Sequence, residues 1–425
     1  MLRPGGPDVG NEGGHRHRRA VALAAVTGLA VGLLVGCGHA ARSASPTPTG
    51  RSATTGTTPA GASTTTSTTR GTATTTTTPV TTTSASAKTT TTMVTGPPCP
   101  SAGWTVRRKV AQLVMIGVDP VGTADATHAV ETLEVGGIFV DGATGLLTSG
   151  VLPKLVGPDG VRPFVAVDEE GGRVQTIDKL DGDLPSARVQ ARTDGPAAIQ
   201  RLAHQRGLEL ARLGVTVDFA PVVDVSDQPD DAVIGDRSYS NDPAVVQRDA
   251  RAFAQGLRGA GLLPVYKHFP GHGHAVGDSH KGAATTPPLS AMGPDLQPYR
   301  TLLGESADEG VMVGHLVVPG LTGGLPASLS PAAIDGLLRH DIGFHGVVFT
   351  DDLGGMKAIT ARFGAAEAAR RAIAAGADEV LFAHFGSPAT VIDSLAAFAR
   401  NGSLPMARID DAVGHILRAK GYACG

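Results

Sequence analysis

Short apolar segments recur along residues 99–425, and segments with the spacing of helices separate most of them. The apolar segments are rich in Val, Ile, Leu and Phe, which is typical of strands buried on both faces of a parallel sheet. Eight of them can be counted: residues 113–118, 137–140, 163–168, 215–220, 263–268, 310–315, 346–351 and 379–383. The pattern therefore predicts a buried sheet built from these strands.

The segments between the strands carry helix signals. Pro196–Leu213 has apolar residues at helical intervals. Ser330 and Pro331 are residue types favoured at the start of a helix, and Gly376 is typical of the residue that follows one. Strands that alternate with helices predict an α/β fold, and eight such units indicate a single catalytic (β/α)8 TIM-like barrel. A doubly wound open sheet is the alternative.

The first 98 residues have a different pattern, and we separate them from a catalytic domain at residues 99–425. Residues 1–36 hold a basic stretch and an apolar run that ends in Gly before Cys37, which is typical of a lipoprotein signal peptide with Cys37 as the lipidated residue. Residues 37–98 are rich in Thr, Ser and Pro, and this linker is predicted to be disordered. We expect an exported protein, lipid-anchored to the extracytoplasmic face of the cell membrane.

Two alternatives for the N-terminal segment are a single transmembrane helix and a plain secretory signal. The apolar run is short for a membrane span, and Cys37 stands where a lipoprotein signal needs it. Cys99 and Cys424 bracket the catalytic domain. The ends of a closed fold lie near each other and an exported protein meets oxidising conditions, so we predict a Cys99–Cys424 disulfide. Two free thiols are the alternative.

The composition narrows the class of partner. The formal net charge is −3 and no basic stripe is present, so we expect no nucleic acid partner. We also expect a monomer with no metal and no cofactor. Polar residues gather where the apolar segments end, which is where a barrel places its catalytic groups: Asp168, Asp218, Lys267, His268, His315 and Asp351.

Residues 267–280 are the densest in chemistry, with four histidines among glycines. A zinc site, a phosphate-binding loop and an ordinary surface loop are alternatives, but the His-Glu-x-x-His and Gly-x-Gly-x-x-Gly spacings are missing. We favour a catalytic loop in which Asp278 orients His280. A carboxylate partner favours the imidazolium, which can donate a proton near neutral pH.

A second cluster, residues 346–353, ends a strand with Asp351 and Asp352. Strand alternation places Asp351 on the same side as Val347 and Phe349. If that side faces the barrel interior, Asp351 emerges at the end of the seventh strand, where a carboxylate can attack an anomeric carbon. Asp352 fits a helix N-cap, and a Gly-x-Ser-x-Gly serine hydrolase motif is missing.

Seven motifs in family order resemble glycoside hydrolase family 3, in its single-domain NagZ-type β-N-acetylglucosaminidase branch and an actinobacterial lipoprotein form. The resemblance runs from about Trp104 to the end of the chain. Lys-His-Phe-Pro-Gly-His-Gly followed by Asp-x-His is its most specific part. The motifs lie at residues 136–139, 168–175, 219–225, 234–239, 267–273, 278–280 and 350–353.

The resemblance implies that Asp351 is the nucleophile and that His280 is the general acid/base with Asp278 as its partner. It implies that the N-acetylglucosamine ring is held by Asp168, Arg237, Lys267 and His268. The activity it implies is retaining hydrolysis of terminal β-linked N-acetylglucosamine from peptidoglycan fragments in cell-wall turnover, through a covalent glycosyl-enzyme.

The chain departs from the family pattern at two positions and leaves other activities open. Thr176 replaces an Arg that often contacts the sugar, and counting back from Met356 would name Asp352 as the nucleophile. A His in place of an acid carboxylate repels phosphate less, so a phosphorylase is an alternative. A family 3 β-glucosidase, which usually carries its acid/base on an additional domain, and a non-catalytic sugar-binding lipoprotein are the others.

Overall fold

A computed structural model of the chain describes residues 96–424. The predicted signal peptide, the lipidation residue Cys37 and almost all of the linker lie outside the described residues. Within the described part, no helix is long and apolar enough to cross a membrane.

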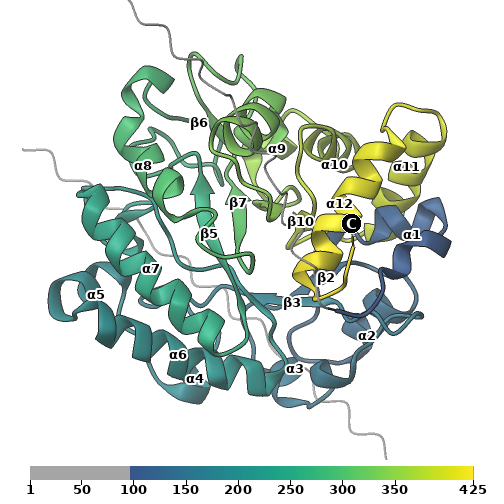
Figure 1. Ribbon diagram of the computed structural model, residues 1–425, viewed down its shortest axis with the longest axis horizontal. Coiled ribbons are helices and arrows are strands. Elements are labelled where there is room, and N and C mark those ends of the chain that lie inside the picture. The colour runs from purple at the N-terminus through teal and green to yellow at the C-terminus, as the bar shows by residue number, and fades with distance from the viewer. Residues whose placement is uncertain (1–95, 425) are drawn as a thin grey trace, which may run out of the picture. The chain divides into compact units, whose positions relative to one another are not determined.

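Eight parallel strands form the centre of the domain, and helices surround them (Figure 1). The sheet order is β10-β1-β2-β3-β4-β5-β7-β9, and a parallel bridge from Phe349 to Glu379 joins its two edges. The strands are β1 (Val114–Gly117), β2 (Gly137–Phe139), β3 (Phe164–Val167), β4 (Val217–Asp218), β5 (Leu263–Phe269), β7 (Gly310–Val313), β9 (Val347–Thr350) and β10 (Val380–Phe382). The predicted eight-stranded α/β barrel is confirmed, and each strand lies within or overlaps its predicted segment.

Most α-helices occupy the connections between strands, while one precedes the first strand and two follow the last. The longest, α6, has the predicted bounds, because Pro196 starts it and Gly214 follows it in the left-handed conformation (φ 94°). The α-helices are α1 (Val106–Ala111), α2 (Ala124–Glu131), α3 (Gly145–Thr148), α4 (Asp178–Asp181), α5 (Ala187–Thr193), α6 (Pro196–Leu213), α7 (Pro243–Gly259), α8 (Gly293–Leu302), α9 (Lys357–Thr360), α10 (Ala365–Ala374), α11 (Pro388–Arg400) and α12 (Met406–Ala419).

Shorter elements complete the domain. A second parallel pair, β6 (Ala284–Thr285) with β8 (Leu316–Val317), lies beyond the ends of β5 and β7. The helix expected after Ser330 and Pro331 is η6 (Ala332–Asp341), with π-helical hydrogen bonding. The 3-10 helices are η1 (Pro100–Gly103), η2 (Leu152–Lys154), η3 (Gly235–Arg237), η4 (Leu289–Ala291) and η5 (Ala327–Leu329).

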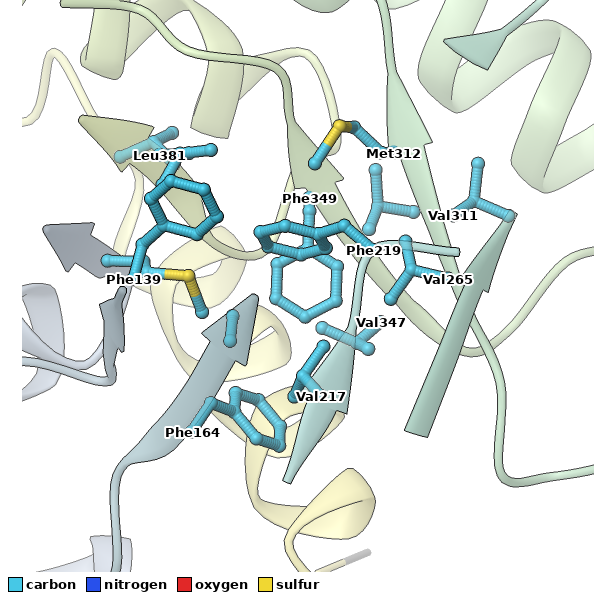
Figure 2. Packing of buried hydrophobic residues seen from close by; sticks show 14 of the residues in the cluster. Phe139, Phe164, Val217, Phe219, Val265, Val311, Met312, Val347, Phe349 and Leu381 are labelled. Atoms are coloured by element: carbon cyan, nitrogen blue, oxygen red, sulfur yellow. The ribbon is translucent and has the colours of Figure 1, made fainter. Parts of the chain in front are cut away.

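Aromatic side chains fill the barrel interior (Figure 2). Phe219 packs against Phe139 and Phe349, with ring centroids 5.9 and 5.4 Å apart, and Phe164 meets Phe349 at 5.9 Å. These four rings come from different strands or from the residue just after one. The lumen below the site is therefore a packed core and not a pore, as in other barrels of this size.

The ends of the catalytic domain are joined covalently. Cys99 and Cys424 form a disulfide with their Cα atoms 4.8 Å apart, which confirms the predicted pair. Pro98 also forms a parallel bridge with Ala423. The crosslink closes a loop that contains the whole barrel.

Candidate active site

The carboxyl ends of the strands surround a cavity of about 650 Å³. Every residue to which the family resemblance gives a catalytic or sugar-binding role lines it, whereas the strand-end residues Asp218 and His315 are buried outside its lining. The residues with such a role come from the β3, β5 and β9 strand ends, from η3, and from the loop that follows β5: Asp168, Arg237, Lys267, His268, Asp278, His280 and Asp351.

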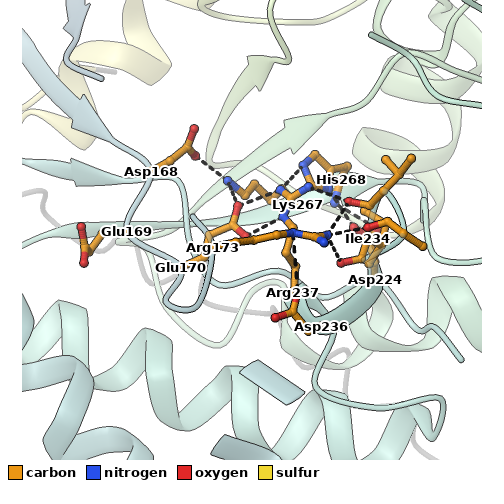
Figure 3. A network of polar contacts seen from close by, with 12 residues as sticks. Asp168, Glu169, Glu170, Arg173, Asp224, Ile234, Asp236, Arg237, Lys267 and His268 are labelled. Atoms are coloured by element: carbon orange, nitrogen blue, oxygen red, sulfur yellow. Dashed lines mark hydrogen bonds and ion pairs between the residues drawn. The ribbon is translucent and has the colours of Figure 1, made fainter. Parts of the chain in front are cut away.

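Lys267 lines the cavity, and its side chain is only 2% exposed. The ammonium lies 2.5 Å from a carboxylate oxygen of Asp168 and 2.5 Å from one of Glu170 (Figure 3). Burial works against the charge, but the two carboxylates raise the pKa of Lys267 above its ordinary value. Burial and the neighbouring Glu170 raise the pKa of Asp168, so Glu170 is the more firmly charged of the two.

Glu170 extends this network to the next sugar-binding candidate. Its two carboxylate oxygens each accept a hydrogen bond of 2.7 Å from the guanidinium of Arg237, a bidentate geometry that fixes the Arg plane. Burial opposes the charge on Glu170, but Arg237 and Lys267 hold its pKa far below the ordinary value. Glu170 was given no role by sequence reasoning, although it stands in the same motif as Asp168.

Asp224 sets the tautomer of His268 (Figure 3). A carboxylate oxygen of Asp224 lies 2.7 Å from Nδ1 of His268, and the other accepts the backbone N–H of His272 at 2.6 Å. Burial would raise the pKa of Asp224, but His268 and His272 lower it, so the carboxylate is ionised. Nδ1 of His268 therefore donates, and Nε2 is left to accept from Arg237 at 3.3 Å.

Asp351 and Asp352 differ sharply in their contacts. Asp351 follows β9, lines the cavity, and accepts a hydrogen bond from the backbone N–H of Asp352 at 2.9 Å. The Asp352 carboxylate instead accepts three backbone N–H groups, from Gly354, Gly355 and Ala383, at 2.8 to 3.0 Å. Asp351 thus has oxygen lone pairs free for a ligand, while Asp352 organises the chain after the strand.

The surroundings of Asp351 favour its ionised form. Burial would raise the pKa of its carboxyl, but His315, His268 and the backbone N–H of Asp352 lower it below the ordinary value. His315 itself is 1% exposed and has both ring nitrogens engaged, with Oγ of Ser328 at 2.7 Å and the carbonyl oxygen of Asp352 at 2.9 Å. His315 therefore supports the end of β9 and is not available for proton transfer.

Asp278 and His280 lie on the loop between β5 and β6. Nδ1 of His280 lies 3.1 Å from a carboxylate oxygen of Asp278, and the same oxygen accepts the His280 backbone N–H at 3.0 Å. The imidazole is 62% exposed, so Nε2 can reach a ligand in the cavity. Burial opposes the charge on Asp278, but Lys281 and His280 lower its pKa, which keeps a carboxylate beside the imidazole.

The loop is attached by its backbone to the segment that follows Asp351. The N–H groups of Lys357 and Ala358 donate to the carbonyl oxygens of His280 and Ser279 at 3.4 and 3.0 Å. The chain that carries the candidate nucleophile therefore also anchors the candidate acid/base. The sequence gave no signal for this contact, because His280 and Lys357 are 77 positions apart.

Thr176 faces away from the cavity. It is 2% exposed, and its hydroxyl donates to the carbonyl oxygen of Asp168 at 2.9 Å. Arg173 of the same motif lines the cavity and donates to carbonyl groups of the 230–234 segment. The position that often carries a sugar-binding Arg thus supports the strand end here.

The histidines of the 267–280 region do not converge on one point. His274 is paired with Asp295 at 2.8 Å and does not line the cavity. Within residues 96–424, no group of three or more His, Cys, Asp or Glu side chains is arranged to hold a metal ion. The polar cavity, which has the size of a sugar ring, is instead lined by the Asp351 carboxylate and by the His280–Asp278 pair.

Comparison with known proteins agrees with this geometry. The family model for the glycosyl hydrolase family 3 N terminal domain matches residues 105–419. The chain is 45% identical over 406 residues to the beta-hexosaminidase LpqI of Mycobacterium tuberculosis, which covers 93% of this chain and 96% of that protein.

Solved structures give the same result. A glycosyl hydrolase of the same family from Mycobacterium smegmatis is 48% identical, with a TM-score of 0.72 over 76% of this chain and 98% of that one. A family 3 β-N-acetylglucosaminidase from a Paenibacillus species is 32% identical, with a TM-score of 0.70 over 75% of this chain and 62% of that one. The chain belongs to glycosyl hydrolase family 3 and is a glycoside hydrolase.

Proposed function

We propose that this glycoside hydrolase is a retaining β-N-acetylhexosaminidase that releases terminal N-acetylglucosamine from peptidoglycan fragments. The observation that carries the mechanism is the contrast between the two neighbouring carboxylates. Asp351 faces the cavity with free lone pairs, whereas Asp352 is occupied by three backbone N–H groups. Relatives described as β-hexosaminidase and β-N-acetylglucosaminidase support the substrate.

The reaction has two steps in this proposal. Asp351 attacks the anomeric carbon while Nε2 of His280 gives a proton to the departing oxygen, so the glycosidic bond breaks and an ester to Asp351 forms. His280 then takes a proton from water, which attacks the same carbon and releases Asp351. The ring hydroxyls are held by the ionised network around Lys267 and Arg237, which is rigid because each cation is shared or bidentate.

Two measurements test the mechanism. The first sugar released from an aryl β-N-acetylglucosaminide should have the β configuration when observed by NMR before mutarotation. A 5-fluoro N-acetylglucosamine derivative should leave a mass adduct on the peptide that contains Asp351. A product of inverted configuration, or an adduct on Asp352, would contradict the mechanism.

Phosphorolysis is the competing activity, because an imidazole acid/base places less negative charge near an anionic acceptor. Digestion of N-acetylglucosaminyl-N-acetylmuramic acid with and without phosphate separates the two. Hydrolysis predicts free N-acetylglucosamine in both buffers. Accumulation of the sugar 1-phosphate in phosphate buffer would show that the enzyme is a phosphorylase and would overturn the proposed hydrolysis.

We also propose that the protein is exported and held at the membrane by a lipid on Cys37, as a monomer. The Cys99–Cys424 disulfide supports an oxidising compartment. Metabolic labelling with a palmitate analogue should mark the wild type and not Cys37→Ser, and light scattering should give the mass of one chain. Equal labelling of both proteins would refute the anchor.

A further inference from the structure

His272 is a buried histidine that faces the sugar cavity without a partner for its side chain. It is 3% exposed and lines the cavity, yet neither ring nitrogen has a hydrogen-bond partner among residues 96–424. A buried polar group that lacks a partner destabilises the folded protein. Such a group beside a cavity therefore indicates that something in the cavity completes its hydrogen bonds.

The backbone around His272 is fixed, so the ring cannot relieve this cost by moving out. The His272 N–H donates to Asp224 at 2.6 Å, and the carbonyl of the next residue, Gly273, accepts from Oγ of Ser226 at 3.1 Å. A Cβ added to Gly273 would lie 1.9 Å from the carbonyl oxygen of Val225. The loop is thus pressed against the segment after β4, and the imidazole is held in place.

The ring is neutral in this position. Burial lowers the pKa of His272, and Asp224 and Asp351 offset this only in part. A neutral imidazole offers one N–H donor and one nitrogen acceptor. Its ring centroid is 6.0 Å from that of His268, in an edge-to-face arrangement, so the two histidines form adjoining parts of one wall.

We propose that His272 is a specificity residue of the sugar subsite, in which a ring nitrogen hydrogen-bonds to a donor or an acceptor of the bound amino sugar. Hydroxyl and acetamido groups both provide a donor and an acceptor. This assignment rests on the proposed function. It adds to the set predicted from the sequence, in which His272 had no sugar-binding role.

Replacement by Phe separates a sugar contact from a structural role. His272→Phe keeps an aromatic ring and removes both nitrogens. Because those nitrogens have no protein partner, we expect the melting temperature to stay the same or rise. We expect kcat/KM for an aryl β-N-acetylglucosaminide to fall about 10–100-fold, the usual effect of a lost sugar hydrogen bond in a buried site. His272→Gln, which keeps a donor and an acceptor, should recover part of the activity.

His274→Phe is the matched control, because His274 lies on the same loop but outside the cavity and pairs with Asp295. It should retain activity and lose stability, the reverse of His272→Phe. A His272→Phe protein that melts lower and keeps its kcat/KM would show a structural role and overturn the proposal.

Binding of free sugars distinguishes this inference from the proposed function. Isothermal titration of wild type and His272→Phe with N-acetylglucosamine and with glucose gives two affinity ratios. If His272 contacts the acetamido group, only N-acetylglucosamine loses affinity, and if it contacts a hydroxyl, both lose it. Equal affinity of the two proteins for both sugars overturns the inference. Absence of β-N-acetylglucosaminide turnover by the wild type would overturn the proposed function instead.

Discussion

Substitution of Asp351 and Asp352 should separate catalysis from stability at adjacent positions. Asp351→Asn keeps the shape of the side chain, and its amide oxygen can still accept the N–H of Asp352. We therefore expect a stability loss of no more than about 1–2 kcal/mol. Activity should fall by about 10⁴-fold or more, because an amide cannot form the ester intermediate.

Asp352→Ala should have the opposite effect, with a large loss of stability and a small loss of activity. The substitution removes the acceptor of three backbone N–H groups, which lie in a buried or half-buried turn. Hydrogen bonds to a charged acceptor contribute about 1.5–3 kcal/mol each, and they are not fully additive, so we expect a loss of about 3–6 kcal/mol. In a domain of this size that corresponds to a decrease of roughly 5–15 °C in melting temperature.

The assay is calorimetry combined with kcat on an aryl β-N-acetylglucosaminide, corrected for the folded fraction. Asp352→Asn serves as the control, since its amide oxygen can replace Oδ1, which accepts from Gly354 and Ala383. It should therefore be intermediate in stability. An inactive but stable Asp352→Ala protein, together with an active Asp351→Asn protein, would refute the assignment of the nucleophile.

Three further predictions concern other parts of the chain. His280→Ala should lose most activity on substrates with poor leaving groups and least in the first step on activated aryl glycosides, and azide should restore the second step. Asp278→Ala should show a milder form of the same pattern. An equal loss of activity on every leaving group would count against the acid/base role of His280. Burial raises the pKa of Glu309 to about 7, so its neutral form stabilises the fold at low pH and this contribution is lost as pH rises from about 4.5 to 7. Glu309→Gln should remove that dependence, so from pH 5 to pH 8 its unfolding free energy in urea should rise by about 2–3 kcal/mol relative to that of the wild type. Parallel pH profiles of stability for the two proteins would contradict this. Reduction of the Cys99–Cys424 disulfide, which spans 325 residues, should lower stability by about 5 kcal/mol or less, and an unchanged unfolding midpoint after complete reduction would contradict it.

The sequence was sufficient for the fold because each element carries its own local signal. Strands buried on both faces read as continuous apolar runs, and all eight were found in this way. The bounds of α6 match the predicted segment: the ring of Pro196 fixes the backbone at its start, and Gly214 can adopt the left-handed conformation at its end. The disulfide followed from the closure of the fold and the positions of two cysteines at its ends.

The sequence also named the residues around the cavity, since catalytic groups in a barrel stand where strands end. It did not determine what each of them does. Asp351 and Asp352 were ordered by strand alternation, but the spacing to Met356 pointed the other way. Only the tertiary structure shows which carboxylate is occupied, because one donor, Ala383, follows β10 and lies 31 residues from Asp352 in the sequence.

The same reason explains the other roles that the sequence left open. Glu170, Asp224 and His272 lie in the family motifs, but the local sequence gives none of them a role. Their roles depend on partners 44 to 97 residues away in the sequence. Glu170 pairs with Arg237 and Lys267, and Asp224 pairs with His268. A local pattern records which groups are present and which way a strand directs them. Pairing, burial and the charge state of each group arise only when distant segments pack together, and those were decided by the tertiary structure alone.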